Sequence, residues 1–282
     1  MRRLPVPIDN PGNVFIDCID LVRNTNLKAR LTEIRNLVIE AADEFEEKVT
    51  TGQLHTVIRE TLINGNVTST ELQDVYERMV RKGTLGRKIY DKLIIASPSG
   101  ICPLCSHREV TQIDHYLPKA EYPRLSVVPI NLVPSCSDCN KSKLTKFPQA
   151  PEEETLHPYF DNIENDVWLT ATVTQSNPAS FQFQVTPPDH WDPLLSDRVR
   201  FHFNSLSLNK LYSTQAAVEL VQINFRLIKI YAVSGSPGVR QYLLEGAESR
   251  SHANLNSWQT AMYKAMTADN WFCDGGFRFL PI

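Results

Sequence analysis

The sequence of 282 residues predicts an α+β fold: a mainly helical chain with one small mixed module near its middle and a β-hairpin after that module. Three observations lead to this prediction. Apolar residues recur at helical spacing through the first third, two Cys-x-x-Cys pairs bracket a proline-rich stretch, and two alternating apolar–polar segments follow. We therefore divide the chain into a helical region at 1–97, a central module at 98–160, and a hairpin with helices at 161–282.

The first region is predicted to be helical. Apolar residues recur within 12–49 at steps of three and four, which gives one buried helical face. The residues of this face are Leu27, Leu31, Ile34, Val38, Ala41 and Phe45. A second helix restarts with Ser69 or Thr70 as the expected N-cap. The segment "GTLGRKIYDKLIIAS" predicts another short helix, which ends at Pro98.

The central region is predicted to be short strands followed by one helix. Prolines at 118, 123, 129 and 134 exclude a long helix. The segment "EVTQIDH" is typical of an extended strand, and a helix is expected from about Ser137 through Lys146.

The last region is predicted to begin with a β-hairpin. Both "VWLTATVTQ" and "SFQFQVT" alternate apolar with polar residues. Asp192-Pro193 then predicts a helix start. The segment "AAVELVQINFRLIKIYAV" predicts a buried helix, and Pro237-Gly238 and "NSWQTAMYKAMTADNWF" predict two closing helices.

The cysteines indicate a structural metal. Of six cysteines, four form two Cys-x-x-Cys pairs: Cys102 with Cys105, and Cys136 with Cys139. Each pair can present two thiolates to one zinc ion, which prefers four tetrahedral ligands. Because no export signal precedes them, such pairs favour zinc over disulfides. Reduced core cysteines and a redox Cys-x-x-Cys are the weaker alternatives. We therefore predict a Zn²⁺ held by all four.

Between the two pairs lie residues suited to hydrolysis of a phosphodiester. Asp114 and His115 are consecutive in an extended segment, so their side chains should leave on opposite faces. Asn131 and Asn140 follow. Oxygen ligands from Asp114 and Asn140 suit Mg²⁺ or Mn²⁺. His115 could be the base that deprotonates water, provided that one ring nitrogen is fixed by a hydrogen bond.

These motifs resemble a known family. "IDHYLP" and "PINLVPSCSDCNKSK", flanked by "CPLC", resemble the HNH endonuclease family over about 50 of the 282 residues. The resemblance implies a ββα-metal fold with His115 as general base and a catalytic metal on Asp114 and Asn140. It also implies that Asn131 holds the loop and His115 in place. Many members share the four-cysteine zinc site, and many have Asn, as here, at the third motif position.

A narrower resemblance implies a biological role. "DHYLPKAEYPRLSVVPINLVPSCSDCNKSK", followed by "HPYFD", is similar to the HNH nuclease subunits of Septu-type anti-phage systems, including retron-linked ones. In those systems the nuclease works with an ABC-like ATPase. The resemblance therefore implies antiviral defence and an ATPase partner protein.

Basic side chains near the motif are candidate phosphate contacts, with a solvated surface as the alternative. They are Lys119, Lys141, Lys143 and Lys146. His157 either lies near the metal site or caps a loop. The densest basic run is Arg78, Arg81, Lys82, Arg87, Lys88 and Lys92. It could follow a nucleic-acid backbone, contact an acidic partner, or be a solvated helix face.

Overall charge and hydropathy limit the classes of function. The net charge of −3 is unlike that of a protein that coats nucleic acid non-specifically. No apolar run approaches the roughly 20 residues that cross a bilayer, so we expect a cytoplasmic location and no membrane partner. Two functions remain open. One is a nuclease acting on DNA or on structured RNA such as tRNA; the other is a catalytically inert, zinc-stabilised interaction module.

Overall fold

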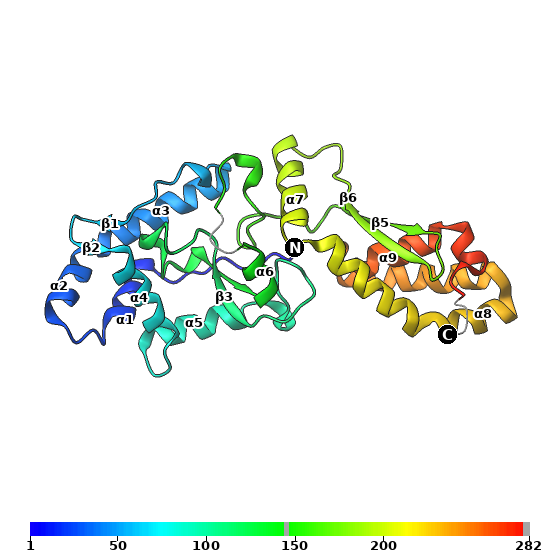
Figure 1. Cartoon of the computed structure of the whole chain (residues 1–282), viewed down its shortest axis with the longest axis horizontal. Coiled ribbons are helices and arrows are strands. Elements are labelled where there is room, and N and C mark those ends of the chain that lie inside the picture. The colour runs from blue at the N-terminus through cyan, green and yellow to red at the C-terminus, as the bar shows by residue number, and fades with distance from the viewer. Residues whose placement is uncertain (144–146, 279–282) are drawn as a thin grey trace. The chain divides into compact units, whose positions relative to one another are not determined.

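The computed structural model describes residues 1–143 and 147–278 (Figure 1). The chain divides into two compact units, Met1–Asn162 and Ile163–Ile282. Helices predominate and the strands form small antiparallel pairs, so the prediction of an α+β class is confirmed. The predicted regions 1–97 and 98–160 both lie in the first unit.

The first unit opens with α-helices that pack around an apolar core. They are α1 (Pro11–Ile19), α2 (Thr25–Glu33), α3 (Arg35–Thr51), α4 (Ser69–Val80) and α5 (Leu85–Ile95). The predicted apolar positions Val38, Ala41 and Phe45 are buried on α3, and α1 contacts α3, α4 and α5. The helical periodicity of the sequence is confirmed here.

Helix α4 begins one residue earlier than predicted. Its N-cap is Thr68, whose hydroxyl accepts a hydrogen bond from the Glu71 backbone N–H (3.2 Å). The Glu71 carboxylate in turn accepts one from the Thr68 N–H (2.9 Å), which completes a capping box. Thr68 has the extended backbone of an N-cap because it ends β2 (Val67–Thr68), which pairs with β1 (Leu62–Ile63).

Two antiparallel strands and a short helix form the centre of the first unit. Strand β3 (Gln112–His115) pairs with β4 (Leu132–Ser135), and α6 (Ser137–Lys143) follows directly. The predicted continuation of this helix to Lys146 lies outside the described residues. Short 3-10 helices occupy the connections: η1 (Leu54–Thr56), η2 (Pro98–Gly100), η3 (Pro123–Leu125), η4 (Pro129–Asn131) and η5 (Pro151–Glu153).

The second unit combines a β-hairpin with helices. Strands β5 (Leu169–Thr174) and β6 (Ser180–Val185) pair antiparallel, which confirms the predicted hairpin. The helical elements are α7 (Pro193–Ser205), α8 (Leu208–Ala253), α9 (Trp258–Ala268) and the π-helical turn η6 (Phe272–Gly276). The Asp192 carboxylate caps α7 by accepting from the Leu194 N–H (3.1 Å), so the predicted helix start is also confirmed.

Helix α8 is only partly buried, which differs from the prediction of a buried helix. Its exposed large apolar residues are Val218, Val221, Phe225, Ile228, Val233 and Leu244. Leu220, Ile223 and Leu227 are buried, so the helix is amphipathic. A sequence of mostly apolar residues does not show how many faces its neighbours cover. Pro237 and Gly238, where a separate closing helix is predicted, lie inside α8, and Gly235 just before them leaves helical geometry with φ 60° and ψ −158°, a conformation that glycine tolerates.

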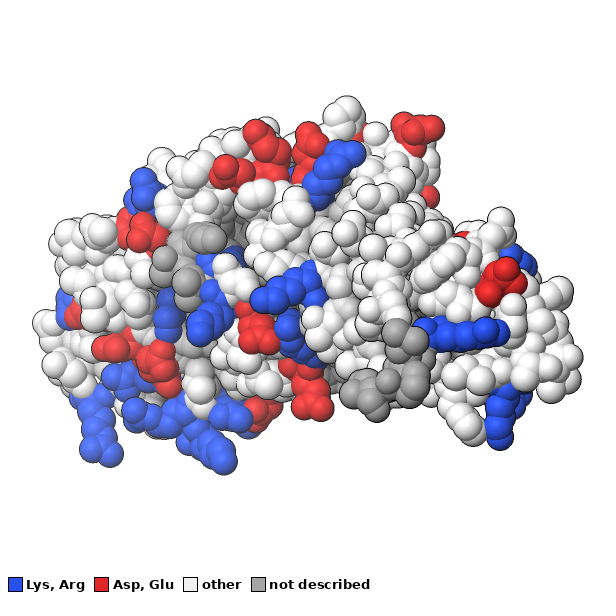
Figure 2. Space-filling model, turned by 45° about the vertical axis from the view of Figure 1, so that its right-hand side comes forward, with Lys and Arg blue, Asp and Glu red and all other residues white. Residues whose placement is uncertain are grey.

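The charged side chains are unevenly distributed over the surface. In Figure 2, Lys and Arg side chains gather at the lower left, in the part of the chain that contains α4 and α5. Across residues 1–143 and 147–278, no helix combines the length and apolar character that crossing a membrane requires.

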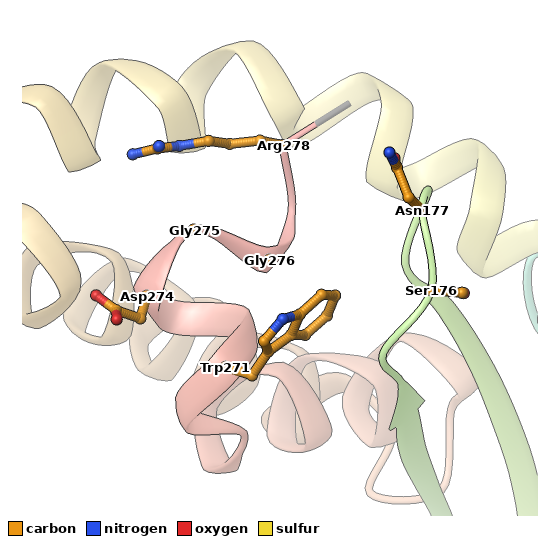
Figure 3. A pocket seen from close by; sticks show the side chains of 7 residues that line it. All are labelled: Ser176, Asn177, Trp271, Asp274, Gly275, Gly276 and Arg278. Carbon is orange, nitrogen blue, oxygen red and sulfur yellow. The ribbon is translucent and has the colours of Figure 1, made fainter. Parts of the chain in front are cut away.

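The second unit has a shallow pocket of about 370 Å³ beside the turn of its hairpin (Figure 3). Its charged lining residues already have partners. The Arg278 guanidinium lies over the Tyr231 ring (4.5 Å to the centroid), and Asp274 accepts a hydrogen bond from the Tyr231 hydroxyl (3.0 Å). None of the site residues predicted from the sequence lines it. The candidate site lies instead in the first unit.

Candidate metal centre and active site

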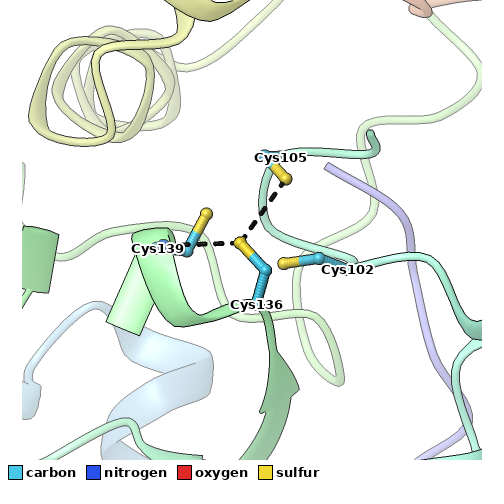
Figure 4. A group of neighbouring side chains, drawn as sticks. All are labelled: Cys102, Cys105, Cys136 and Cys139. Atoms are coloured by element: carbon cyan, nitrogen blue, oxygen red, sulfur yellow. Dashed lines mark hydrogen bonds between the residues drawn. The ribbon is translucent and has the colours of Figure 1, made fainter. Parts of the chain in front are cut away.

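The four paired cysteines come together in the folded chain (Figure 4). Cys102 and Cys105 lie in a tight turn, in which the Cys102 N–H donates to the Arg108 carbonyl (2.7 Å). Cys136 follows β4, and Cys139 lies in the first turn of α6. An ion pair between Arg108 and Asp138 (2.7 Å) joins the turn that contains Cys102 and Cys105 to α6.

The geometry of the sulfur atoms suits one metal ion. All four Sγ atoms lie within 4.8 Å of one another, and those of Cys105 and Cys136 are 4.0 Å apart. A tetrahedral site with Zn–S distances of about 2.3 Å places sulfur atoms about 3.8 Å apart. Backbone N–H groups also point at two of the sulfurs, those of Cys105 (3.5 Å) and Cys136 (3.4 Å). These buried cysteines could hold a metal such as zinc.

The electrostatics of the cluster favour a cation. A hydrogen bond from Cys102 lowers the pKa of Cys136 to about 7, and the neighbouring thiols also lower the pKa of Cys105. The pKa values of Cys102 and Cys139 are raised instead. A bound metal would stabilise the thiolate form of all four sulfurs.

His115 is oriented by a backbone carbonyl. It ends β3, and its Nε2 lies 2.9 Å from the carbonyl oxygen of Ser126. Since a carbonyl only accepts, Nε2 carries the ring proton and Nδ1 is the nitrogen able to accept one. The Tyr76 ring packs edge-on against the imidazole (4.4 Å between centroids). Burial lowers the pKa of His115 to about 3, so the ring is neutral at physiological pH.

Asn131 fixes the loop between β3 and β4. It is fully buried at the end of η4, and its Oδ1 accepts from the Leu117 N–H (2.7 Å). Its Nδ2 donates to the carbonyls of Leu117 (3.1 Å) and Leu125 (3.2 Å). Ser126, whose carbonyl orients His115, follows Leu125 directly. Asn131 therefore holds the segment that positions the imidazole.

The Asp114 side chain points from β3 toward α6, where it forms an ion pair with Lys143. The Lys143 ammonium lies 3.0 Å from Asp114 Oδ2 and also donates to the carbonyl of His115. Burial raises the pKa of Asp114 and lowers that of Lys143, while their attraction opposes both shifts. Asn140 is three residues before Lys143, so both lie on one face of α6. Of these two, Lys143 contacts the Asp114 carboxylate, and Asn140 is half-buried one turn earlier in the same helix.

The other predicted residues are placed as follows. Lys119 pairs with Glu77 (2.7 Å) and lies over the Tyr76 ring (4.4 Å), whereas Lys141 is exposed on α6. Lys143 points inward, because its side chain is only 12% exposed. Lys146 lies outside the described residues.

His157 is buried beside the site. Its ring contacts the Tyr116 ring (4.4 Å between centroids). Its ring Nδ1 accepts a hydrogen bond from the Tyr159 backbone N–H (3.2 Å), and the His157 backbone N–H donates one to the Asp161 carboxylate (2.7 Å). These contacts describe a histidine that orders the loop after η5, which was the second interpretation of the sequence.

Two groups that surround His115 could not be found from the sequence. Tyr76 belongs to the buried apolar stripe of α4, and nothing in the sequence pattern links it to His115. The Ser126 carbonyl is a backbone group and leaves no trace in residue type. The inward turn of Lys143 could be suspected only from its helical spacing to Asn140.

Comparison with known proteins gives two similarities. The chain is 28% identical to protein ea31 of Escherichia phage lambda over 98% of this chain and 100% of that protein. A shorter match, 35% identical over 66 residues, relates it to the Septu protein PtuB of Bacillus thuringiensis. The shorter match covers 23% of this chain and 25% of PtuB. No family model matches the chain, and no solved structure matches it.

Proposed function

We propose that the protein is a metal-dependent endonuclease of the HNH type that hydrolyses phosphodiester bonds in nucleic acid. The observation that carries the proposal is the hydrogen bond between His115 Nε2 and the Ser126 carbonyl. It leaves Nδ1 as a proton acceptor on a buried, neutral ring at the end of a strand, next to a buried carboxylate. A general base needs this fixed tautomer.

His115 would take the proton of the attacking water at Nδ1. The hydrogen bond from Nε2–H to the Ser126 carbonyl persists during this transfer, so the carbonyl stabilises the imidazolium that forms. Tyr76 restricts the ring from one side, and Asn131 holds the loop that supplies the carbonyl. The positions of the base and its supports thus come from three separate elements of the first unit.

Asp114 and Asn140 would hold the catalytic Mg²⁺ or Mn²⁺. A carboxylate and an amide oxygen are suitable donors for such hard cations. The fit is supported by Lys143, because its ammonium shows that the buried carboxylate attracts a cation. When bound, the ion stabilises charge on the scissile phosphate and on the leaving oxygen.

Replacing Lys143 by glutamine should strengthen binding of the catalytic metal. In the wild type the ammonium must leave Asp114 before the carboxylate can ligate an ion. We expect Lys143→Gln to lower the Kd for Mn²⁺ about tenfold, which corresponds to about 1.4 kcal/mol. Titration of zinc-loaded protein by electron paramagnetic resonance measures this Kd. Lys141→Gln, on an exposed position of the same helix, is the control and should leave it unchanged. Equal Kd values for all three proteins would contradict the competition.

We also propose that the protein is the nuclease subunit of an anti-phage defence complex with an ABC-like ATPase. The partial similarity to Septu PtuB supports this role. Co-purification of the tagged chain with an ATPase encoded beside its gene tests the pairing. A defence role requires that phage plating fall only when both genes and an intact His115 are present.

Cleavage assays with His115→Ala test the nuclease proposal. Plasmid DNA and total tRNA are incubated with Mg²⁺ or Mn²⁺, with and without the ATPase. We expect the variant to cleave about 10² to 10⁴ times more slowly than the wild type, because this is the usual contribution of a general base. His190→Ala, an exposed histidine of the second unit, is the control and should cleave normally.

The opposite result identifies the alternative function. If the wild type binds zinc and cleaves neither nucleic acid under any condition, the chain is an inert zinc-stabilised module. Equal rates for the wild type and His115→Ala would instead remove His115 from the mechanism.

A further inference from the structure

Four cations at the corner between α4 and α5 have no ion-pair partner among the described residues. We call Arg78, Arg81, Lys82 and Lys88 the α4–α5 corner. Arg81, Lys82 and Lys88 are exposed and Arg78 is half-buried. The other two members of the basic run are paired, Arg87 with Asp91 (2.7 Å) and Lys92 with Asp9 (2.8 Å). The corner therefore carries a local positive charge on a chain whose net charge is −3.

The corner is held rigidly by its own backbone contacts. The Thr84 hydroxyl donates to the carbonyls of Arg78 (3.1 Å) and Arg81 (2.9 Å), and accepts from the Arg87 N–H (3.1 Å). The Arg87 guanidinium donates to the Val80 carbonyl (2.7 Å) at the end of α4. Arg87 thus stabilises the turn between α4 and α5, around which the four cations of the α4–α5 corner lie.

Close packing fixes α5 as well. A Cβ atom on Gly86 would lie 2.7 Å from Cys18 Sγ and 3.2 Å from the Cα of Met79. The first turn of α5 therefore lies directly on α1 and α4. A surface that is already ordered loses less entropy when it binds a ligand.

The same helix connects the corner to the candidate active site. Tyr76 of α4 packs on the His115 ring, and the next residue, Glu77, pairs with Lys119 over that tyrosine. Arg78 follows Glu77, so the cations begin within one turn of the residue that covers the imidazole. Helix α5 also contacts β3 and β4. The corner and His115 belong to one packed body, the first unit.

We propose that the α4–α5 corner binds the phosphodiester backbone of the nucleic acid that the site cleaves. This inference rests on the proposed function and names where the substrate is held. Phosphates favour clustered Lys and Arg side chains whose charge is not already neutralised by an ion pair. Such contacts position the strand without reading its sequence, so they serve DNA and RNA alike.

Salt-dependent binding tests this proposal separately from cleavage. The background is His115→Ala, so that binding is measured without hydrolysis. Into it we place Arg78→Gln, Arg81→Gln, Lys82→Gln and Lys88→Gln together. The matched control removes the same charge from exposed positions of the second unit: Lys210→Gln, Arg226→Gln, Lys229→Gln and Lys264→Gln. The probes are a labelled DNA duplex and labelled tRNA, followed by fluorescence anisotropy between 50 and 300 mM salt.

The corner variant should bind at least tenfold more weakly than the control at low salt. Each lost phosphate contact reduces the slope of log K against log salt by about 0.9 for duplex DNA. We therefore expect the slope of the fourfold corner variant to fall by about 3 to 4 with the probe that binds more tightly. The double variant Lys82→Gln with Lys88→Gln should lower the slope by about half as much. The preferred probe shows whether the backbone is that of DNA or RNA.

Equal slopes and affinities for the corner and control variants would overturn the proposal, as would failure of the parent protein to bind either probe. If the wild type cleaves but the slopes are equal, the nuclease proposal stands and the corner is excluded. If the slope falls but the wild type never cleaves, the corner binds nucleic acid in a protein without nuclease activity. Equal zinc content and circular dichroism establish that all variants are folded.

Discussion

Cys139→Ser should lose its metal and the ordered structure of the central module, residues 98–160. Apparent binding free energies of structural zinc are about 10 to 16 kcal/mol, as large as the whole stability of a typical domain. The four cysteines join the turn before β3 to the start of α6, so the loss releases both ends of the segment that contains Asp114 and His115. Zinc content, near-ultraviolet circular dichroism and proteolysis within 98–160 measure the effect.

The control is a cysteine of the second unit. Cys273 is buried, and its thiol donates to the Met266 carbonyl (3.2 Å). We expect Cys273→Ala to keep one zinc per chain and to cost about 1 to 2 kcal/mol, as for other lost buried contacts. If Cys139→Ser keeps native dichroism and protease resistance, or if the wild type contains no metal, the cysteines are simply part of the apolar core.

Local signals explain what the sequence predicted. Two residues separate Cys102 from Cys105 and Cys136 from Cys139, and this spacing brings two thiols together whatever the rest of the chain does. The hairpin of the second unit is predictable for a similar reason. Residues two apart in a strand share a face, so Phe181 and Phe183 reveal a buried side by alternation alone.

Contacts between distant segments explain what the sequence could not predict. Tyr76 and His115 meet only because α4 packs beside β3, and no spacing rule joins them. Lys143 was considered a phosphate contact, yet it points inward because the buried carboxylate of Asp114 needs a counter-charge. The exposed face of α8 is another case, since the coverage of a helix depends on its neighbours.

Asp114→Asn should abolish metal-dependent cleavage while the module stays folded. The amide is nearly the same size as the carboxylate, and its oxygen can still accept from Lys143. It lacks the negative charge that binds Mg²⁺ or Mn²⁺ strongly. Loss of about 4 kcal/mol of transition-state stabilisation corresponds to about a thousandfold. We expect the cleavage rate to fall at least this far, measured at saturating substrate over a range of Mg²⁺ concentrations.

Removal of this charge leaves the Lys143 ammonium buried without an anion, which costs free energy of folding. The double variant Asp114→Asn with Lys143→Gln removes both charges and should therefore be more stable to urea than Asp114→Asn, yet equally inactive. Glu109→Gln is the control, because that carboxylate is on the same module but exposed and outside the metal centre, and it should retain activity. If the double variant cleaves at the wild-type rate and with the same dependence on Mg²⁺, Asp114 only neutralises Lys143 and does not bind a catalytic metal.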